Sequence, residues 1–170
     1  MPPLAIRPHR ASDVDPLYEA VRESIAEISR WMPWCHDGYS RDDTVARIES
    51  MPAAWENETE FSFVIEAPGG QLLGCCGLNR FDRRDGTANL GYWVRTSATR
   101  QGVATGAVGL LRTWAFANTD FHRLEILSAV DNVASQCVAR KAGAEFEGVL
   151  KQRLVLHGRR HDAALFSLLR

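Results

Sequence analysis

The sequence lacks the features that mark several large classes of protein. No apolar run approaches the roughly 18–20 residues that span a bilayer, and residues 1–10 hold no apolar signal core. We therefore expect a cytoplasmic protein with no membrane partner. Charge of one sign is also lacking, because 20 Lys and Arg stand against 21 Asp and Glu. Proteins that bind nucleic-acid phosphates usually carry a basic excess, so nucleic acid is not an expected partner.

Cysteine is sparse, and its four copies form no redox or metal motif. No C-x-x-C occurs, and no Cys/His spacing suggests zinc, so we expect no metal. Cys75 and Cys76 are neighbours in an apolar run, where buried reduced thiols are expected. His157 and His161 flank turn-like residues 158–160, which favours a hairpin there over a helical metal pair.

Enough apolar residues are present for one globular domain over residues 1–170, with 45% hydrophobic and 24% charged residues. Apolar periodicity predicts the order β-α-α-β-β-β-α-β-α-β-β. This order indicates an α/β (α+β) domain with a mixed, mostly antiparallel sheet. Strands are expected at 4–7, 61–66, 71–78, 87–94, 124–130, 146–156 and 162–168, and helices at 12–29, 40–55, 102–118 and 133–142.

Two of these helices begin at sequences that resemble capping boxes. Ser12 is followed by Asp15, and Ser40 by Asp43, so each serine is expected to cap a helix start. Pro52 falls inside the second of these helices, where it is expected to kink or shorten it.

The loop and helix start at 100–105 could bind an anion. Gly102 and Ala104 keep side-chain bulk low where free backbone N–H groups and the positive end of the helix dipole would meet. A pyrophosphate could lie across these amides, and Arg100 would add charge. A small-residue helix start that packs against the sheet explains this segment equally well.

An ordered set of motifs along nearly the whole chain resembles the GNAT superfamily of acetyl-coenzyme A-dependent N-acetyltransferases. Within it the chain is similar to the RimJ/RimL type, which acetylates protein N-terminal amines. The matching pieces are W-M-P-W (Trp31–Trp34), A-N-L-G-Y-W-V (Ala88–Val94), R-Q-G-V-A-T (Arg100–Thr105), Asn132 with Ser135 followed by K-A-G, and the C-terminal F-S-L-L.

The resemblance implies a GNAT fold whose two central strands splay apart, and acetyl-CoA (acetyl-coenzyme A) as co-substrate. It places backbone pairing with the pantetheine arm at the end of one strand and pyrophosphate binding at the following helix start. The implied cofactor-binding residues are Trp93, Val94, Arg95, Arg100, Gln101, Gly102, Val103, Ala104, Thr105 and Asn132. Ser135 would give a proton to the leaving thiolate. Taken alone, Asn132 could simply cap a helix, and Ser135 could be an ordinary first-turn residue.

One residue departs from the family pattern. Family members often have glutamate where this chain has Asn89, and that glutamate is a candidate base for the incoming amine. An amide cannot accept the proton at neutral pH, although it can hold a water. Either the proton leaves through water, or the activity is weak or the substrate different. Asn89 and Ser135 are the candidate catalytic residues.

The acceptor is expected to be a primary amine, either a protein N-terminus or a small amine, attacked directly without a covalent enzyme intermediate. The aromatic residues Trp31, Trp34 and Tyr92 are candidates for its cleft, and Trp34 is the tryptophan expected to face it. Trp31 and Trp34 could equally anchor their loop in the core. The alternative function is a non-catalytic GNAT module that binds acyl-CoA or a partner. A homodimer is compatible with the resemblance.

Overall fold

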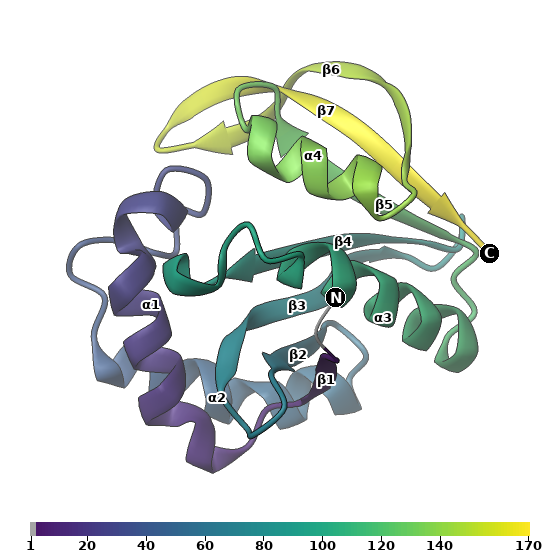
Figure 1. Ribbon diagram of the computed structural model, residues 1–170. Helices are drawn as coiled ribbons and strands as arrows, with labels where there is room; N and C mark the ends of the chain where they lie inside the picture. The colour runs from purple at the N-terminus through teal and green to yellow at the C-terminus, as the bar shows by residue number, and fades with distance from the viewer. Residues whose placement is uncertain (1–2) are drawn as a thin grey trace.

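The computed structural model describes residues 3–170, which form one seven-stranded sheet with helices on both faces (Figure 1). The strand order is β1-β2-β3-β4-β5-β7-β6, and every neighbouring pair except β4 and β5 is antiparallel. The predicted element order is therefore confirmed. The strands are β1 Ala5–Pro8, β2 Phe61–Glu66, β3 Leu72–Asp82, β4 Thr87–Val94, β5 Arg123–Ala129, β6 Glu145–Leu156 and β7 Arg159–Leu169; the helices are α1 Val14–Ile28, α2 Arg41–Glu56, α3 Val103–Asn118 and α4 Val133–Lys141.

The two central strands pair over a short stretch only. β4 and β5 run parallel, with register partners at 87–89 in β4 and 123–125 in β5. Beyond Asn89, β4 keeps its pairing with β3 as far as Val94, and β5 keeps its pairing with β7 as far as Ala129. The strands thus diverge toward their C-terminal ends, and backbone groups of 90–94 on the β5 side have no ladder partner. The predicted splay is confirmed.

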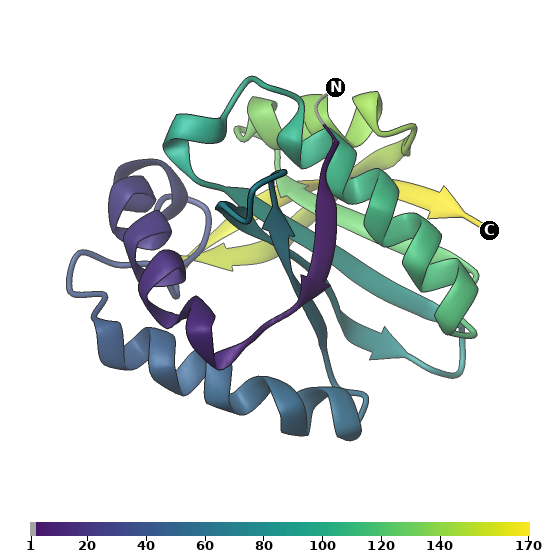
Figure 2. The same cartoon turned by 60° about the horizontal axis from the view of Figure 1, so that its bottom comes forward.

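Each sheet face carries its own apolar core. Helices α3 and α4 cover one face, where Phe63, Leu78, Leu90, Leu111 and Phe166 are buried together. Helices α1 and α2 cover the other face, as Figure 2 shows, and Leu17, Val21, Ile48 and Val64 are buried together there. Side chains alternate between the faces along a strand, so successive residues of β4 serve two different sides of the sheet.

Of the two predicted serine caps, the structure contains one and not the other. Ser40 caps α2 as expected, because its hydroxyl accepts the N–H of Asp43 (3.2 Å) and the Asp43 carboxylate accepts the N–H of Ser40 (2.8 Å). Pro52 lies inside α2, yet the helix continues to Glu56. The Ser12 cap was wrong: a 3-10 turn at Ala11–Asp13 precedes α1, and the Asp13 carboxylate accepts the Arg10 N–H instead (2.7 Å).

The C-terminal hairpin is longer than expected. β6 ends at Leu156 and β7 begins at Arg159, so the turn consists of His157 and Gly158 alone. Both have positive φ (49° and 73°), the conformation of a two-residue hairpin turn. This turn keeps His157 and His161 off any helix. Residues 3–170 contain no cluster of three or more metal-ligating side chains.

The four cysteines are free thiols. Cys75 and Cys76 are buried, as predicted, whereas Cys137 is exposed on α4. Burial raises the pKa of Cys75 to about 12, so its nucleophilic thiolate is not formed at neutral pH. Among residues 3–170, no helix is long and apolar enough to cross a bilayer.

Candidate active site

The start of α3 presents unpaired amides at one end of the splayed strands. Gly102 caps the helix with φ 79°, a left-handed conformation that glycine adopts freely. The first intrahelical hydrogen bond runs from the Gly106 N–H to the Gly102 carbonyl (2.9 Å). The N–H groups of Val103, Ala104 and Thr105 therefore precede the helical ladder and can bind an anion.

Side chains around these amides differ in what they can reach. Arg100 and Gln101 are exposed, whereas the Val103 side chain is buried in the core. Only the backbone of Val103 can therefore meet a ligand. Gln101 donates its side-chain N–H to the Ser97 carbonyl (2.9 Å), so it holds the loop in place. Arg100 remains the nearby cation that could add to anion binding.

Arg95 was predicted to contact the coenzyme, and the structure places its side chain against α1. Its guanidinium is ion-paired with Glu23, with Nε 2.9 Å from the carboxylate. Its backbone N–H donates to Leu73 (2.8 Å) and its carbonyl accepts the N–H of Ala98 (3.0 Å). The hydrogen bonds from Arg95 lower the pKa of Glu23 to about 2. Arg95 therefore fixes the loop between β4 and α3 to α1.

Tyr92 and α4 meet across the splay. The Tyr92 hydroxyl donates to the Ser135 carbonyl (2.9 Å) and lies 3.1 Å from the Ser135 hydroxyl. Burial raises the pKa of Tyr92 to about 12, so the phenol keeps its proton. Asn132 caps α4, accepting the N–H of Ser135 (3.1 Å). The capping role weighed for Asn132 is thus observed, and its amide N–H groups are not used in that bond.

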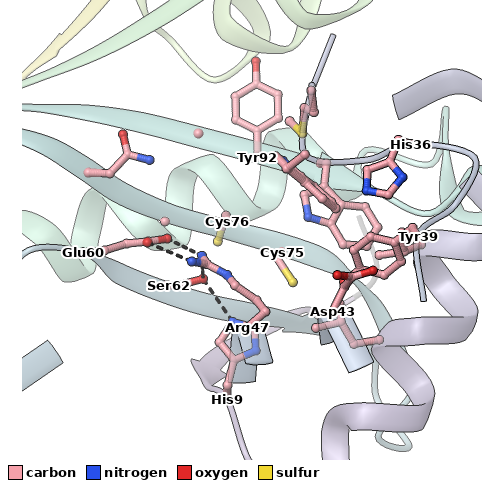
Figure 3. Close-up of a pocket in the computed structure, with 18 residues that line it drawn as sticks. His9, His36, Tyr39, Asp43, Arg47, Glu60, Ser62, Cys75, Cys76 and Tyr92 are labelled. Atoms are coloured by element: carbon pink, nitrogen blue, oxygen red, sulfur yellow. Dashed lines mark hydrogen bonds and ion pairs between the residues drawn. The ribbon is translucent and has the colours of Figure 1, made fainter. Parts of the chain in front are cut away.

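A cavity of about 520 Å³ opens on the opposite side of β4, between the sheet and helices α1 and α2. Aromatic rings form one wall: the ring centroid of Trp34 lies 5.9 Å from Tyr39 and 6.0 Å from Trp93. Trp34 is 45% exposed. Trp31 is not among the lining residues and instead lies under the Arg30 guanidinium. Tyr92 borders the cavity, but its phenol points away toward α4 (Figure 3).

Charged groups at the cavity form a paired network and one unpaired carboxylate. Figure 3 shows the Arg47 guanidinium between the Glu60 carboxylate and Ser62, which in turn contacts the His9 ring. Arg47 forms a double ion pair with Glu60, and His9 Nε2 lies 3.0 Å from the Ser62 hydroxyl. Burial, with Arg47 nearby, lowers the pKa of His9 to about 4. The Asp43 carboxylate also lines the cavity, and it has no ion pair with a basic side chain in residues 3–170.

Sequence reasoning missed this network. Its members come from β1's C-terminal side, α2 and β2, so no local spacing connects them. One signal was present: Glu60 and Ser62 alternate with Phe61 and Phe63, and this period of two places both polar side chains on the face opposite the phenylalanines. Arg47 carried no comparable pattern.

Asn89 lies on the same sheet face as Gly91 and Trp93, but it does not line the cavity. Its Nδ2 donates to Oδ1 of Asn79, its cross-strand partner on β3 (2.9 Å). Asn79 does line the cavity, and so do the next cross-strand partners, Gly77 and Gly91. The sequence drew attention to Asn89 alone, because its partner depends on the register of β3 and β4.

A family model decides the classification. The model described as the acetyltransferase (GNAT) domain matches residues 4–145. The chain belongs to the GNAT acetyltransferase family. The predicted fold, family and acetyltransferase activity are confirmed.

Relatives of this GNAT chain include ribosomal-protein acetyltransferases. It is 27% identical over 154 residues to the ribosomal-protein-serine acetyltransferase of Escherichia coli (strain K12), covering 91% of this chain and 86% of that protein. A solved structure of the ribosomal-protein α-N-acetyltransferase RimL with coenzyme A has a TM-score of 0.88 at 25% identity, covering 98% and 93% of the two chains. The microcin self-immunity acetyltransferase MccE, solved with acetyl-CoA and AMP, has a TM-score of 0.89 at 23% identity, covering 98% and 92%, which shows the shared fold.

Proposed function

We propose that this GNAT acetyltransferase acetylates the α-amine of a peptide or protein N-terminus, with acetyl-CoA as the donor. The proposal rests on a site with two sides. A helix start suited to an anion and an open sheet edge lie on one side of β4, and a cavity lies on the other. The relatives named for ribosomal-protein acetylation support the choice of acceptor.

The residues present fit a coenzyme A thioester. The amides of Val103, Ala104 and Thr105, with Arg100 beside them, would hold the pyrophosphate. The unpaired backbone at Trp93 and Val94 would pair with the pantetheine amides as a strand does, and the free Nδ2 of Asn132 would add a donor. When bound, acetyl-CoA supplies an activated acetyl group.

The cavity suits an amine that arrives as a cation. Arg47 and Glu60 neutralise one another, which leaves the Asp43 carboxylate as the uncompensated charge among the lining residues. The faces of Trp34 and Trp93 attract cations as well. An ammonium group is therefore drawn in, while an anionic acceptor is disfavoured.

The proton balance favours an α-amine over a lysine side chain. Asn89 cannot accept a proton, and His9, with a pKa of about 4, is too weak a base for an ammonium group. An α-amine has an ordinary pKa of ~7.7–8.0 against ~10.4 for lysine, so its neutral fraction at pH 7 is roughly 300-fold larger. The chain's residues then need only to orient the neutral amine and let its proton pass to water.

On the far side of β4, the Ser135 hydroxyl would protonate the leaving thiolate. Tyr92 holds Ser135 through its carbonyl and its hydroxyl. Because the Tyr92 phenol keeps its proton and donates it to the Ser135 carbonyl, it would hold the serine in place, and the serine hydroxyl would regain its proton from water.

Two forms of one short peptide test the proposal. In the first the N-terminus is free and a lysine side chain is dimethylated; in the second the N-terminus is blocked and the lysine is free. Thiol release from acetyl-CoA is expected with the first form and at least tenfold less with the second. Faster turnover of the second form would overturn the choice of an α-amine.

The non-catalytic alternative has its own signature. Calorimetry that shows tight coenzyme A binding, with no thiol release across peptide and small amines, would favour a binding module. A homodimer and a cytoplasmic location stay predictions from the sequence; sedimentation of the purified chain tests the first.

A further inference from the structure

The cavity floor is formed by paired positions of β3 and β4 that carry very different side chains. From one end to the other, the cross-strand partners are Asn79 with Asn89, Gly77 with Gly91, and Cys75 with Trp93. A strip of bare backbone therefore runs between a pair of amides and a tryptophan. Asn79, Gly77, Gly91, Cys75 and Trp93 all line the cavity.

The bare strip is open at β4. A Cβ built on Gly91 would meet no heavy atom within 4 Å, so the space above it belongs to the cavity. A Cβ on Gly77 would lie 2.6 Å from the Phe61 carbonyl oxygen, so a side chain is excluded there by β2. An extended chain can therefore approach the floor closely beside the amide pair.

The hydrogen bond within the pair fixes which atoms face the cavity. Asn89 uses Nδ2 to donate to Oδ1 of Asn79. That bond occupies the acceptor end of the Asn79 amide and leaves its Nδ2, which has no protein partner in the described part of the chain, as the donor at the cavity. Asn89 itself does not line the cavity, so its effect on an acceptor passes through Asn79.

We infer that Asn79 binds the first peptide carbonyl of the acceptor, and that Asn89 is a positioning residue that keeps the Asn79 N–H groups turned toward it. This inference rests on the proposed peptide acceptor and names the group that distinguishes it from a simple amine. A neutral amide donor suits a neutral carbonyl oxygen. The free carboxylate of an amino acid is a poorer fit, because Asp43 leaves the lining with an uncompensated negative charge.

Acceptors that differ only in the carbonyl test the inference. One is a seryl-alanine peptide amide, and the other is an amino alcohol that has the same amine and hydroxymethyl group but no carbonyl. For Asn79→Ala we expect KM for the peptide to rise about fivefold, the size expected for one neutral hydrogen bond. The kcat for the peptide and both constants for the amino alcohol should stay within twofold of wild type.

A second variant tests the positioning role. A carboxylate in Asn89→Asp can only accept, so the Asn79 amide must turn to donate to it and present its oxygen to the cavity. The Asn79 amide oxygen then faces the carbonyl oxygen of the peptide, and the two repel one another. KM for the peptide should therefore rise at least tenfold, more than in Asn79→Ala. Asn118→Ala, at the far end of α3, is the matched control and should match wild type for both acceptors.

Thermal melting of each variant establishes that the fold is intact before kinetics are compared. Equal losses with peptide and amino alcohol in Asn79→Ala would overturn the inference while leaving the peptide acceptor in place. A wild-type preference for the amino alcohol would overturn both, and a smaller effect in Asn89→Asp than in Asn79→Ala would remove the positioning role.

Discussion

Placing a negative charge at Gly102 tests the anion site most directly. The glycine stands at the start of α3, one residue before the first free amide, and it is exposed. Asn and Asp are the side chains that best tolerate its left-handed backbone. Gly102→Asp and Gly102→Asn therefore share the same backbone cost and nearly the same volume, and they differ in one charge.

The size of the effect follows from Coulomb's law. With the dielectric constant of water, a unit charge about 5 Å from a doubly charged pyrophosphate is repelled by roughly 1.7 kcal/mol, or about 17-fold in affinity. The same aspartate lies at a helix N-terminus, where it stabilises the helix by ~0.3–1 kcal/mol. Gly102→Asp should therefore bind coenzyme A more than tenfold more weakly than Gly102→Asn while melting no lower.

Calorimetry with coenzyme A, at two salt concentrations, measures the difference. The gap between the two variants should shrink at high salt, because exposed charges are screened. Equal dissociation constants for the aspartate and asparagine variants, with both folded, would show that the α3 start does not hold the pyrophosphate.

Further predictions concern both sides of β4. Ser135→Ala should lower kcat by roughly 10²–10⁴-fold, less where water substitutes, with little change in coenzyme affinity; a wild-type kcat would leave Ser135 as a helix residue only. Tyr92→Phe keeps the ring and removes the contact to Ser135, so kcat should fall, by less than in Ser135→Ala, and an unchanged kcat would refute the support role. Gly91→Val fills open cavity space, so KM for peptides should rise at least fivefold with coenzyme binding unaltered in calorimetry; an unaltered KM would place the acceptor elsewhere. Glu23 has its pKa lowered to about 2 by Arg95, so it stabilises the fold above its ordinary pKa, and that stability is lost as pH falls from about 4.5 to 2. Glu23→Gln should flatten the urea-unfolding stability curve over this interval, and an equally steep curve would contradict the assignment.

Local sequence patterns predicted most of the fold because each helix or strand has a characteristic pattern within a few neighbouring residues. The strand at 87–94, the α3 helix and the Ser40 capping box depend on neighbours in the chain. Ser12 shows where such patterns fail. Its spacing from Asp15 fits a capping box as well as that of Ser40 from Asp43, but the helix start is instead held by Asp13, which binds the Arg10 N–H and the Arg7 guanidinium. A serine and an acid three apart say nothing about competing partners.

The candidate site divides in the same way. Residues proposed for its coenzyme side could be chosen from the sequence, since Gly102 and Ser135 lie in compact motifs. On the proposed acceptor side the sequence pointed to Trp34, which lines the cavity, but the Arg47–Glu60 pair and the Asn79–Asn89 pair are created by packing and strand register. Register becomes known only when the strands are aligned, and a shift of β3 or β4 by one residue would turn its asparagine to the other face and separate the pair.

The divergence of β4 and β5 creates an exposed strand edge in the interior of a sheet. Edges normally invite pairing with a second protein chain, which leads to aggregation. Here the flanking strand β5 and the Tyr92–Ser135 contact stand where a whole incoming strand, with side chains on both faces, would have to fit. An extended molecule without such side chains faces no comparable obstacle. The unpaired backbone of β4 is therefore better suited to a thin extended ligand than to a further β-strand.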